Sequence, residues 1–386
     1  FGRKRIITVG LLVFMLGSVV AALATSIQMV LVGRALQGMG AIGAALLALT
    51  ADLTREEHRT KAMAVVGASI GLAFIVALLL GPLLAPLIGL HGIFWLTAAL
   101  AGLAMLILHL LVPTPQASHQ HPQAGPAREQ VKGVLADTQL LRLDLGIFLL
   151  HAIMTASFVV IPLTLRDRYG AAADSHWTIY AMILPLSFLL MAPFVMYADR
   201  KNRLKHVFVG AIAVLLGAQL GMLASPPSLT LFVLALLVYF MAFNVLEASL
   251  PSLVSRLAPA RAKGTALGVY STSQYLGAGM GGTVGGLIYA HQGIHAVFGV
   301  CAGLGLLWLL AALGMHNPRA LTTRLLRVAA GSDGHAQQLS RRLESVTGVS
   351  QAVVVANEGL AYLKVDEKTL DEVALQAFAA TDDGEP

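Results

Sequence analysis

The sequence predicts an all-α protein that crosses a membrane many times and carries a small α+β domain at its C-terminal end. The 386 residues have a mean hydropathy of +0.76, with 57 % apolar and only 12 % charged residues, whereas a soluble domain carries about 25 % charged residues. Ten segments are apolar over the roughly 20 residues that a helix needs to cross a bilayer. Residues 316–386 are different, because they hold seven basic and ten acidic residues against nineteen and ten in the rest.

This composition excludes a soluble enzyme of ordinary make-up, a disordered chain and a collagen-like fibre. The single cysteine, Cys301, leaves no intramolecular disulfide and no thiolate metal cluster. No nucleophile–base pair, zinc motif or phosphate-binding loop is recognisable. We therefore expect neither an enzyme nor a protein with a cofactor or metal, and the acidic C-terminal part disfavours nucleic-acid binding.

The expected spans are apolar on every face, so they lack the alternation of a β-barrel. Helices are the remaining way to satisfy backbone groups in lipid. The predicted spans are residues 6–25, 27–51, 62–90, 93–112, 141–165, 179–198, 206–224, 229–257, 266–290 and 294–315. Short polar connections separate them, with turn signals such as His91-Gly92.

Basic residues predict the orientation. One set of loops carries sixteen Lys and Arg residues, whereas the opposite set carries only Arg166 and Arg168. Loops rich in basic residues face the cytoplasm. The N-terminal end and the C-terminal domain are both expected there, in a multi-pass protein of the inner (plasma) membrane.

Two stretches of the chain repeat each other. Arg59-Thr60-Lys61 opens the third span and Arg261-Ala262-Lys263 opens the ninth, 202 positions later, each followed by a small residue. Such spacing predicts two parallel membrane halves, over residues 1–113 and 140–316. The stretch 114–139, rich in Pro, Gln, His and Ala, is the predicted cytoplasmic linker. The first half lacks two spans relative to the second, so two further spans are expected upstream.

Residues 320–386 predict a separate cytoplasmic domain. Strands are expected at 321–329, 351–356 and 360–365, with helices at 336–346 and from a cap at Thr369–Glu372 to Ala380. The order βαββα suggests a ferredoxin-like domain. Residues 343–352 resemble heavy-metal-associated domains, but the loop 330–335 has no cysteine, which disfavours a soft metal and favours a regulatory ligand or protein as its partner.

The membrane part resembles the major facilitator superfamily. Gly2-Arg3-Lys4-Arg5 is similar to the end of that family's signature between spans two and three, and residues 197–203 to its second copy. Arg34-x-x-Gln37-Gly38-x-Gly40 is similar to the signature of family span four. Gly81-Pro82 begins the span-five signature, in which Ala85 and Pro86 replace the usual glycine pair. The resemblance covers about the first 316 residues and implies ten of twelve family helices.

Residues 244–253 and 263–275 further resemble the YajR-type branch of drug:proton antiporter-like carriers, which carries an extra C-terminal domain. The resemblance implies a secondary active transporter that exports small amphipathic molecules by alternating access, driven by a proton gradient. A membrane-embedded sensor or scaffold with a regulatory domain is the alternative. Proton-driven flux in vesicles distinguishes the two.

Ionisable groups inside spans are costly and tend to face a cavity or a partner. Glu247, close to Asn244, is the first proton-site candidate, and a structural hydrogen-bonded role is its alternative. His151 could relay protons or simply bond a neighbouring carbonyl. Arg34 is assigned by family analogy to the central cavity. Asp144 is interpreted as an anchor near the membrane edge.

The family resemblance also implies gating and packing residues. Asp52 could pair with Arg3 in a cytoplasmic clasp, or simply end its helix in solvent. The predicted gating residues are Gly2, Arg3, Asp52, Asp199 and Arg203. Spacing of four places Gly277, Gly281 and Gly285 on one helix face, where small residues let helices approach closely; Gly38, Gly81 and Pro82 are the other packing candidates.

Overall fold

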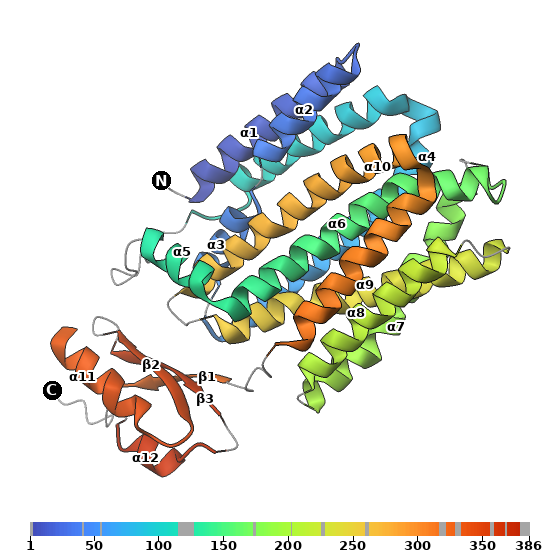
Figure 1. Cartoon of the computed structure of the whole chain (residues 1–386). Helices are drawn as coiled ribbons and strands as arrows, with labels where there is room; N and C mark the ends of the chain where they lie inside the picture. The colour runs from blue at the N-terminus through green and yellow to red at the C-terminus, as the bar shows by residue number, and fades with distance from the viewer. Residues whose placement is uncertain are drawn as a thin grey trace. The chain divides into compact units, whose positions relative to one another are not determined.

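The computed structural model describes residues 3–40, 42–54, 56–114, 127–172, 175–201, 203–224, 228–258, 262–315, 322–328, 333–355, 359–366 and 369–378. Contacts divide the chain into two compact units. One comprises Phe1–Gln123 with Leu165–Leu186, and the other Ala124–Thr164 with Ser187–Pro386. Helices dominate both units, and a small sheet lies near the C-terminal end, as the sequence predicts (Figure 1).

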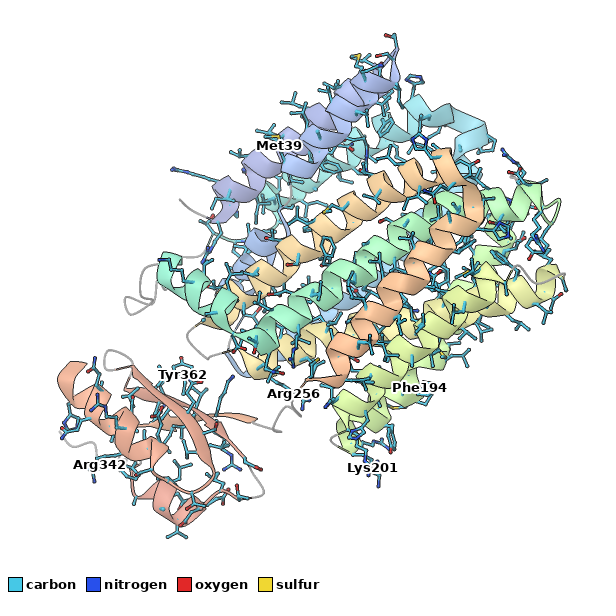
Figure 2. The ribbon with its side chains drawn as sticks, viewed as in Figure 1. Met39, Phe194, Lys201, Arg256, Arg342 and Tyr362 are labelled. Carbon is cyan, nitrogen blue, oxygen red and sulfur yellow. The ribbon has the colours of Figure 1, made fainter. Side chains whose placement is uncertain are left out.

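Within the described ranges, seven helical stretches are long and apolar enough to cross a membrane. Large apolar side chains project from their outer faces, for example Phe194 on the helix that spans His176–Arg200 (Figure 2). A soluble protein would bury such side chains, so lipid is the expected surrounding. The predicted polytopic membrane fold is confirmed.

The first unit is built around α1 (Arg3–Ala22), which packs against α2 (Ile27–Met39) and α4 (Glu56–Leu110). Two glycines let α1 and α2 approach closely, since a Cβ added to Gly33 would lie 2.8 Å from the carbonyl oxygen of Gly17. The predicted span 27–51 is wrong as one helix. It is divided into α2 and α3 (Gly43–Leu53), and Gly40 between them lies against the backbone of α1.

A second difference concerns the turn predicted at His91-Gly92. Both residues are helical, and α4 instead changes direction at Gly89, where φ is 68° and ψ is 177°. Only glycine adopts that conformation readily, so one glycine redirects the helix without a loop. The His91 Nδ1 atom lies 2.8 Å from the backbone oxygen of Ala22 at the end of α1.

The second unit holds α5 (Ala127–Ala136), which lies in the stretch predicted as linker, and the helices that follow it. α8 (Leu204–Leu223), α9 (Leu229–Leu257) and α10 (Lys263–Leu313) pack against one another. α6 (Thr138–Asp167) and α7 (His176–Arg200) each belong in part to both units. α10 joins two predicted spans through Gly293, with φ 79° and ψ −173°.

The helix boundaries repeat along the chain. α1 and α8 are both 20 residues long and begin 201 positions apart. α2 and α9 begin 202 positions apart, and the two redirecting glycines, Gly89 and Gly293, are separated by 204. The offset therefore matches the 202-residue repeat of the sequence.

The C-terminal α/β part contains β1 (Thr322–Arg327), α11 (Asp333–Glu344), β2 (Val349–Val355), β3 (Leu360–Val365) and α12 (Glu372–Gln376). The sheet has the order β1-β3-β2 with both pairings antiparallel, which is compatible with the predicted ferredoxin-like arrangement. Leu343 of α11 belongs to the same buried apolar cluster as Leu363 and Val365 of the sheet. Arg342 and Tyr362 mark this part in Figure 2.

The last helix of this part ends earlier than the sequence predicts. Asp371, which lies within the predicted cap, accepts from the Ala374 backbone N–H and caps the helix, but the helix ends at Gln376 rather than at Ala380. Residues 330–332 of the loop 330–335, which was considered for metal binding, lie outside the described residues. No group of three or more metal-ligating side chains occurs within the described ranges.

Candidate functional site

Close packing of two helices forms the framework of the site. A Cβ added to Gly277 would lie 2.1 Å from the Phe148 carbonyl oxygen, and one added to Gly281 would lie 2.2 Å from that of Ala152. A Cβ added to Gly285 would lie 2.8 Å from the Cα and Cβ atoms of Ala156. The predicted glycine face of α10 thus lies directly on α6, and the two helices run alongside each other in Figure 1.

This packing brings His151 of α6 together with Gln274 of α10 and Glu247 of α9. The Gln274 side-chain nitrogen lies 2.9 Å from His151 Nε2 and 3.1 Å from Glu247 Oε1. Glu247 Oε2 lies 3.9 Å from His151 Nε2. Two residues that the sequence singled out separately therefore belong to one group, bridged by an amide.

The hydrogen bonds define the protonation of the histidine in this arrangement. An amide nitrogen only donates, so His151 Nε2 accepts and the ring proton resides on Nδ1. Nδ1 then donates to the backbone oxygen of Ile147, 3.3 Å away. His151 is consequently neutral here and Gln274 uses both of its N–H groups.

Glu247 retains one unused oxygen. Its Oε2 atom is buried and has no hydrogen-bond partner within the described ranges. The His151 side chain is 10 % exposed and that of Glu247 37 % exposed, while the ring of Phe243 covers the histidine edge-on at 5.8 Å. A charged carboxylate oxygen that is buried without a hydrogen-bond partner is costly. A proton on Oε2 would remove the charge and so lower that cost.

Asn244 lies one turn before Glu247 on α9. Its side-chain nitrogen donates to the Ser187 hydroxyl oxygen on α7 at 3.0 Å. It is therefore near the predicted proton group but bonds another helix.

Arg34 lies in the other unit. It is exposed on α2, and its guanidinium donates to Gln37 Oε1 at 2.7 Å. The Gln37 amide, which is buried, donates in turn to the Ser18 hydroxyl of α1 at 2.6 Å. The arginine therefore extends a polar chain that joins α1 and α2.

For several predicted gating and packing residues, the structure shows few contacts or does not describe the side chain. Gly2 and the side chains of Asp52, Asp199 and Pro82 lie outside the described residues, so the proposed clasp stays a prediction. Arg3 is half-buried at the start of α1, and Arg203 is exposed before α8. A Cβ added to Gly38 or Gly81 would meet no atom within 4 Å.

Sequence reasoning missed Gln274. It occurs in the segment 263–275 that carried the resemblance, and a polar amide in an apolar span was the available signal. The close contacts of Gly17 and Gly33 were also missed. There the signal was the spacing of seven that relates Gly10 to Gly17 and Gly33 to Gly40.

Known proteins that are similar to this chain are membrane transporters. The family model described as the Major Facilitator Superfamily matches residues 1–282 and 143–343. The "Inner membrane transport protein YajR" of Escherichia coli K12 is 38 % identical over 97 % of this chain and 82 % of its own length. An uncharacterised transporter of Buchnera aphidicola is 31 % identical over 72 % of this chain and 71 % of its own. The human organic anion transporter MFSD10 shares the fold, with a TM-score of 0.61 at 22 % identity over 81 % of this chain and 77 % of its own.

Proposed function

Since this chain belongs to the Major Facilitator Superfamily, we propose that it is a proton-coupled exporter of small amphipathic molecules. The protein is a multi-pass membrane protein and its similar proteins are transporters, which are not enzymes. Export, proton coupling and placement in the inner membrane with both ends cytoplasmic are the proposal. Alternating access of the two membrane halves would move the substrate.

The observation that carries the proposal is the His151–Gln274–Glu247 group. It contains two titratable side chains in apolar helices and one buried carboxylate oxygen without a partner. Such groups inside a membrane are expensive and mark ion pathways. A scaffold would gain nothing from them.

The hydrogen bonds also indicate how proton binding changes the site. A proton added to His151 Nε2 turns that atom from acceptor into donor. It then competes with the Gln274 N–H, so the amide must turn its oxygen toward the ring or leave it. Glu247 Oε2, 3.9 Å away, is the acceptor that this new N–H can reach after a small movement.

Glu247→Gln tests the proposal because glutamine resembles the protonated acid in shape. Everted vesicles that contain the full-length protein are loaded with a fluorescent amphipathic dye such as ethidium under an imposed proton gradient. The variant is expected to lose gradient-driven accumulation and to keep downhill exchange of the dye. Ser249→Ala on the same helix is the control, since the Ser249 hydroxyl donates to its own helix at Val245.

Flux is compared per folded molecule. Equal gradient-driven flux in wild type and Glu247→Gln would remove Glu247 from the mechanism. No gradient-driven flux in either, across a panel of dyes of both charges, would favour the sensor or scaffold alternative.

The C-terminal domain is part of the proposal as a regulatory module. Lys364 on β3 is buried, and its ammonium group donates to the backbone oxygens of Arg256, at 3.1 Å, and of Ala258. These carbonyls lie at the end of α9, the helix that carries Glu247. A ligand or protein that binds the domain can therefore act on that helix end.

A further inference from the structure

Gln274 belongs to the His151–Gln274–Glu247 group but has no proton to exchange. Its side-chain nitrogen lies 2.9 Å from His151 Nε2 and 3.1 Å from Glu247 Oε1. An amide nitrogen donates and does not accept, so both of these atoms are held as acceptors. The amide therefore restricts where a proton can bind in the group, although it binds none itself.

The charge of Glu247 sets the orientation of this amide. If the amide were turned, its oxygen would face the carboxylate, and two acceptors without a proton between them repel each other. Because the same nitrogen contacts His151, an ionised Glu247 also keeps an amide N–H against the ring. A proton on His151 Nε2 would then meet that N–H, which places a donor against a donor.

Helix packing holds the amide close to the ring. Gln274 precedes Gly277 by three residues on α10, and His151 follows Phe148 by three residues on α6. A Cβ added to Gly277 would lie 2.1 Å from the Phe148 carbonyl oxygen, so the two backbones touch one turn away from the amide. Gln274 thus cannot leave the ring by a simple separation of the two helices.

The other titratable groups of these helices are not bonded to the group. On α6, Asp144 precedes the histidine by seven residues; on α10, Tyr270 precedes the glutamine by four; and on α9, Tyr239 precedes the glutamate by eight. All three are buried, and within the described ranges the Asp144 Oδ2 atom and both tyrosine hydroxyls have no hydrogen-bond partner. α7 reaches α9 beside the group through an uncharged pair, Ser187 and Asn244.

We infer that Gln274 is a positioning residue that orders proton binding in the group, so that Glu247 binds a proton first and His151 can bind one only afterwards. While Glu247 is ionised, the amide occupies His151 Nε2 and Glu247 Oε1, and Glu247 Oε2 remains without a donor within the described ranges. A hydronium ion that reaches Oε2 loses one O–H bond while one forms on the carboxyl group, and no other reactant is required.

This order is the reverse of what charge alone would produce. His151 Nε2 and Glu247 Oε2 are 3.9 Å apart, and a carboxylate at that distance favours a charged ring. The amide opposes that ion pair until Glu247 is neutral, when its oxygen can turn to accept from the carboxyl O–H and from a protonated ring. The inference rests on the proposed function, because it concerns how Glu247 takes up the coupled proton.

Spectroscopy during stepwise acidification tests the order. Infrared difference spectra report the protonated carboxyl group, and NMR of isotope-labelled histidine rings reports imidazolium, both in the full-length protein in lipid nanodiscs. Glu247→Gln and His151→Asn assign the two signals. In wild type, we expect the Glu247 carboxyl band to appear while the His151 ring is still neutral.

Gln274→Met removes the amide donors and keeps an unbranched, flexible side chain. In this variant, we expect the His151 ring to become imidazolium first and the carboxyl band to be lost at that pH, because the ion pair with Glu247 can now form. Thermal unfolding identifies a variant that fails to fold. Gln274→Glu is the second substitution, since an ionised carboxylate accepts from the ring and should also give an early imidazolium.

Gln219→Met is the matched control. Gln219 is another buried glutamine of this unit, and its amide donates to the Ser157 hydroxyl at 2.9 Å. Its removal should leave the wild-type order of the two signals unchanged, whatever its effect on stability.

The outcomes separate the two proposals. If Gln274→Met shows the wild-type order, the inference is overturned and the proposed function stands, because Glu247 still binds the proton. An imidazolium at His151 in wild type while Glu247 is ionised would overturn it as well, as would a carboxyl band that is lost in Asp144→Asn but not in Glu247→Gln. Undiminished gradient-driven flux in Glu247→Gln would instead contradict the proposed function, whatever the spectra show.

Discussion

Gly281→Ala should damage both stability and the candidate site. The Cβ atom that alanine adds would lie 2.2 Å from the Ala152 oxygen and 2.4 Å from the Thr155 hydroxyl oxygen. Ordinary van der Waals contact begins at 3.4 Å, so α6 and α10 must separate by more than 1 Å. Overpacking of this kind costs about 1–3 kcal/mol.

The same displacement should break the site. The bond between Gln274 and His151 measures 2.9 Å and crosses the same helix pair. An added 1 Å takes it beyond hydrogen-bonding distance. We therefore expect loss of proton-driven dye accumulation even in the fraction of molecules that fold.

Gly286→Ala is the matched control. Gly286 follows Gly285 on α10 and points away from that glycine face, since a Cβ there would meet no atom within 4 Å. Removing a helical glycine gains up to about 1 kcal/mol, so this variant should be as stable as wild type or slightly more so. Thermal unfolding of purified protein and flux per folded molecule are the assays. Equal stability of the two variants would refute the close packing of α6 on α10.

Two further predictions concern backbone conformation and the C-terminal domain. Gly293→Ala places a side chain at φ 79°, which should cost about 1–3 kcal/mol and lower the midpoint of thermal unfolding; a midpoint equal to that of Gly286→Ala would contradict the kink. Leu343→Ala removes a fully buried side chain from the domain core and should cost about 2–5 kcal/mol. Hydrogen exchange should then increase in α11 and β2 while α8–α10 keep their protection, and unchanged exchange in the domain would count against the packing of α11 on the sheet.

The sequence predicted the membrane class, most helix positions and the repeat, because each depends on local composition. A run of apolar residues must become a helix in lipid whatever surrounds it, and α9 has the bounds predicted for it, 229–257. β3 likewise matches its predicted bounds, since alternation along one strand is a local property. The spacing of four between Gly277, Gly281 and Gly285 was enough to predict the glycine face of α10.

The turn at Gly89 could not be predicted correctly from the local sequence. His91-Gly92 reads as a loop signal, but one glycine with positive φ redirects the helix two residues earlier. The division of the span 27–51 likewise depends on the contact of Gly40 with α1. The first outcome depends on the positive φ of Gly89, where an added Cβ would meet no atom within 4 Å, and the second depends on what lies opposite Gly40.

Only the tertiary structure shows which residues of the candidate site lie together. His151, Glu247 and Gln274 are far apart in the sequence, and no spacing rule relates three residues on three helices. Asp144, which we interpreted as an anchor near the membrane edge, is buried in the structure, and the sequence could not show this because burial depends on neighbouring helices. Sequence determines which residues are costly to bury in a membrane, whereas packing determines which of them lie together in one group.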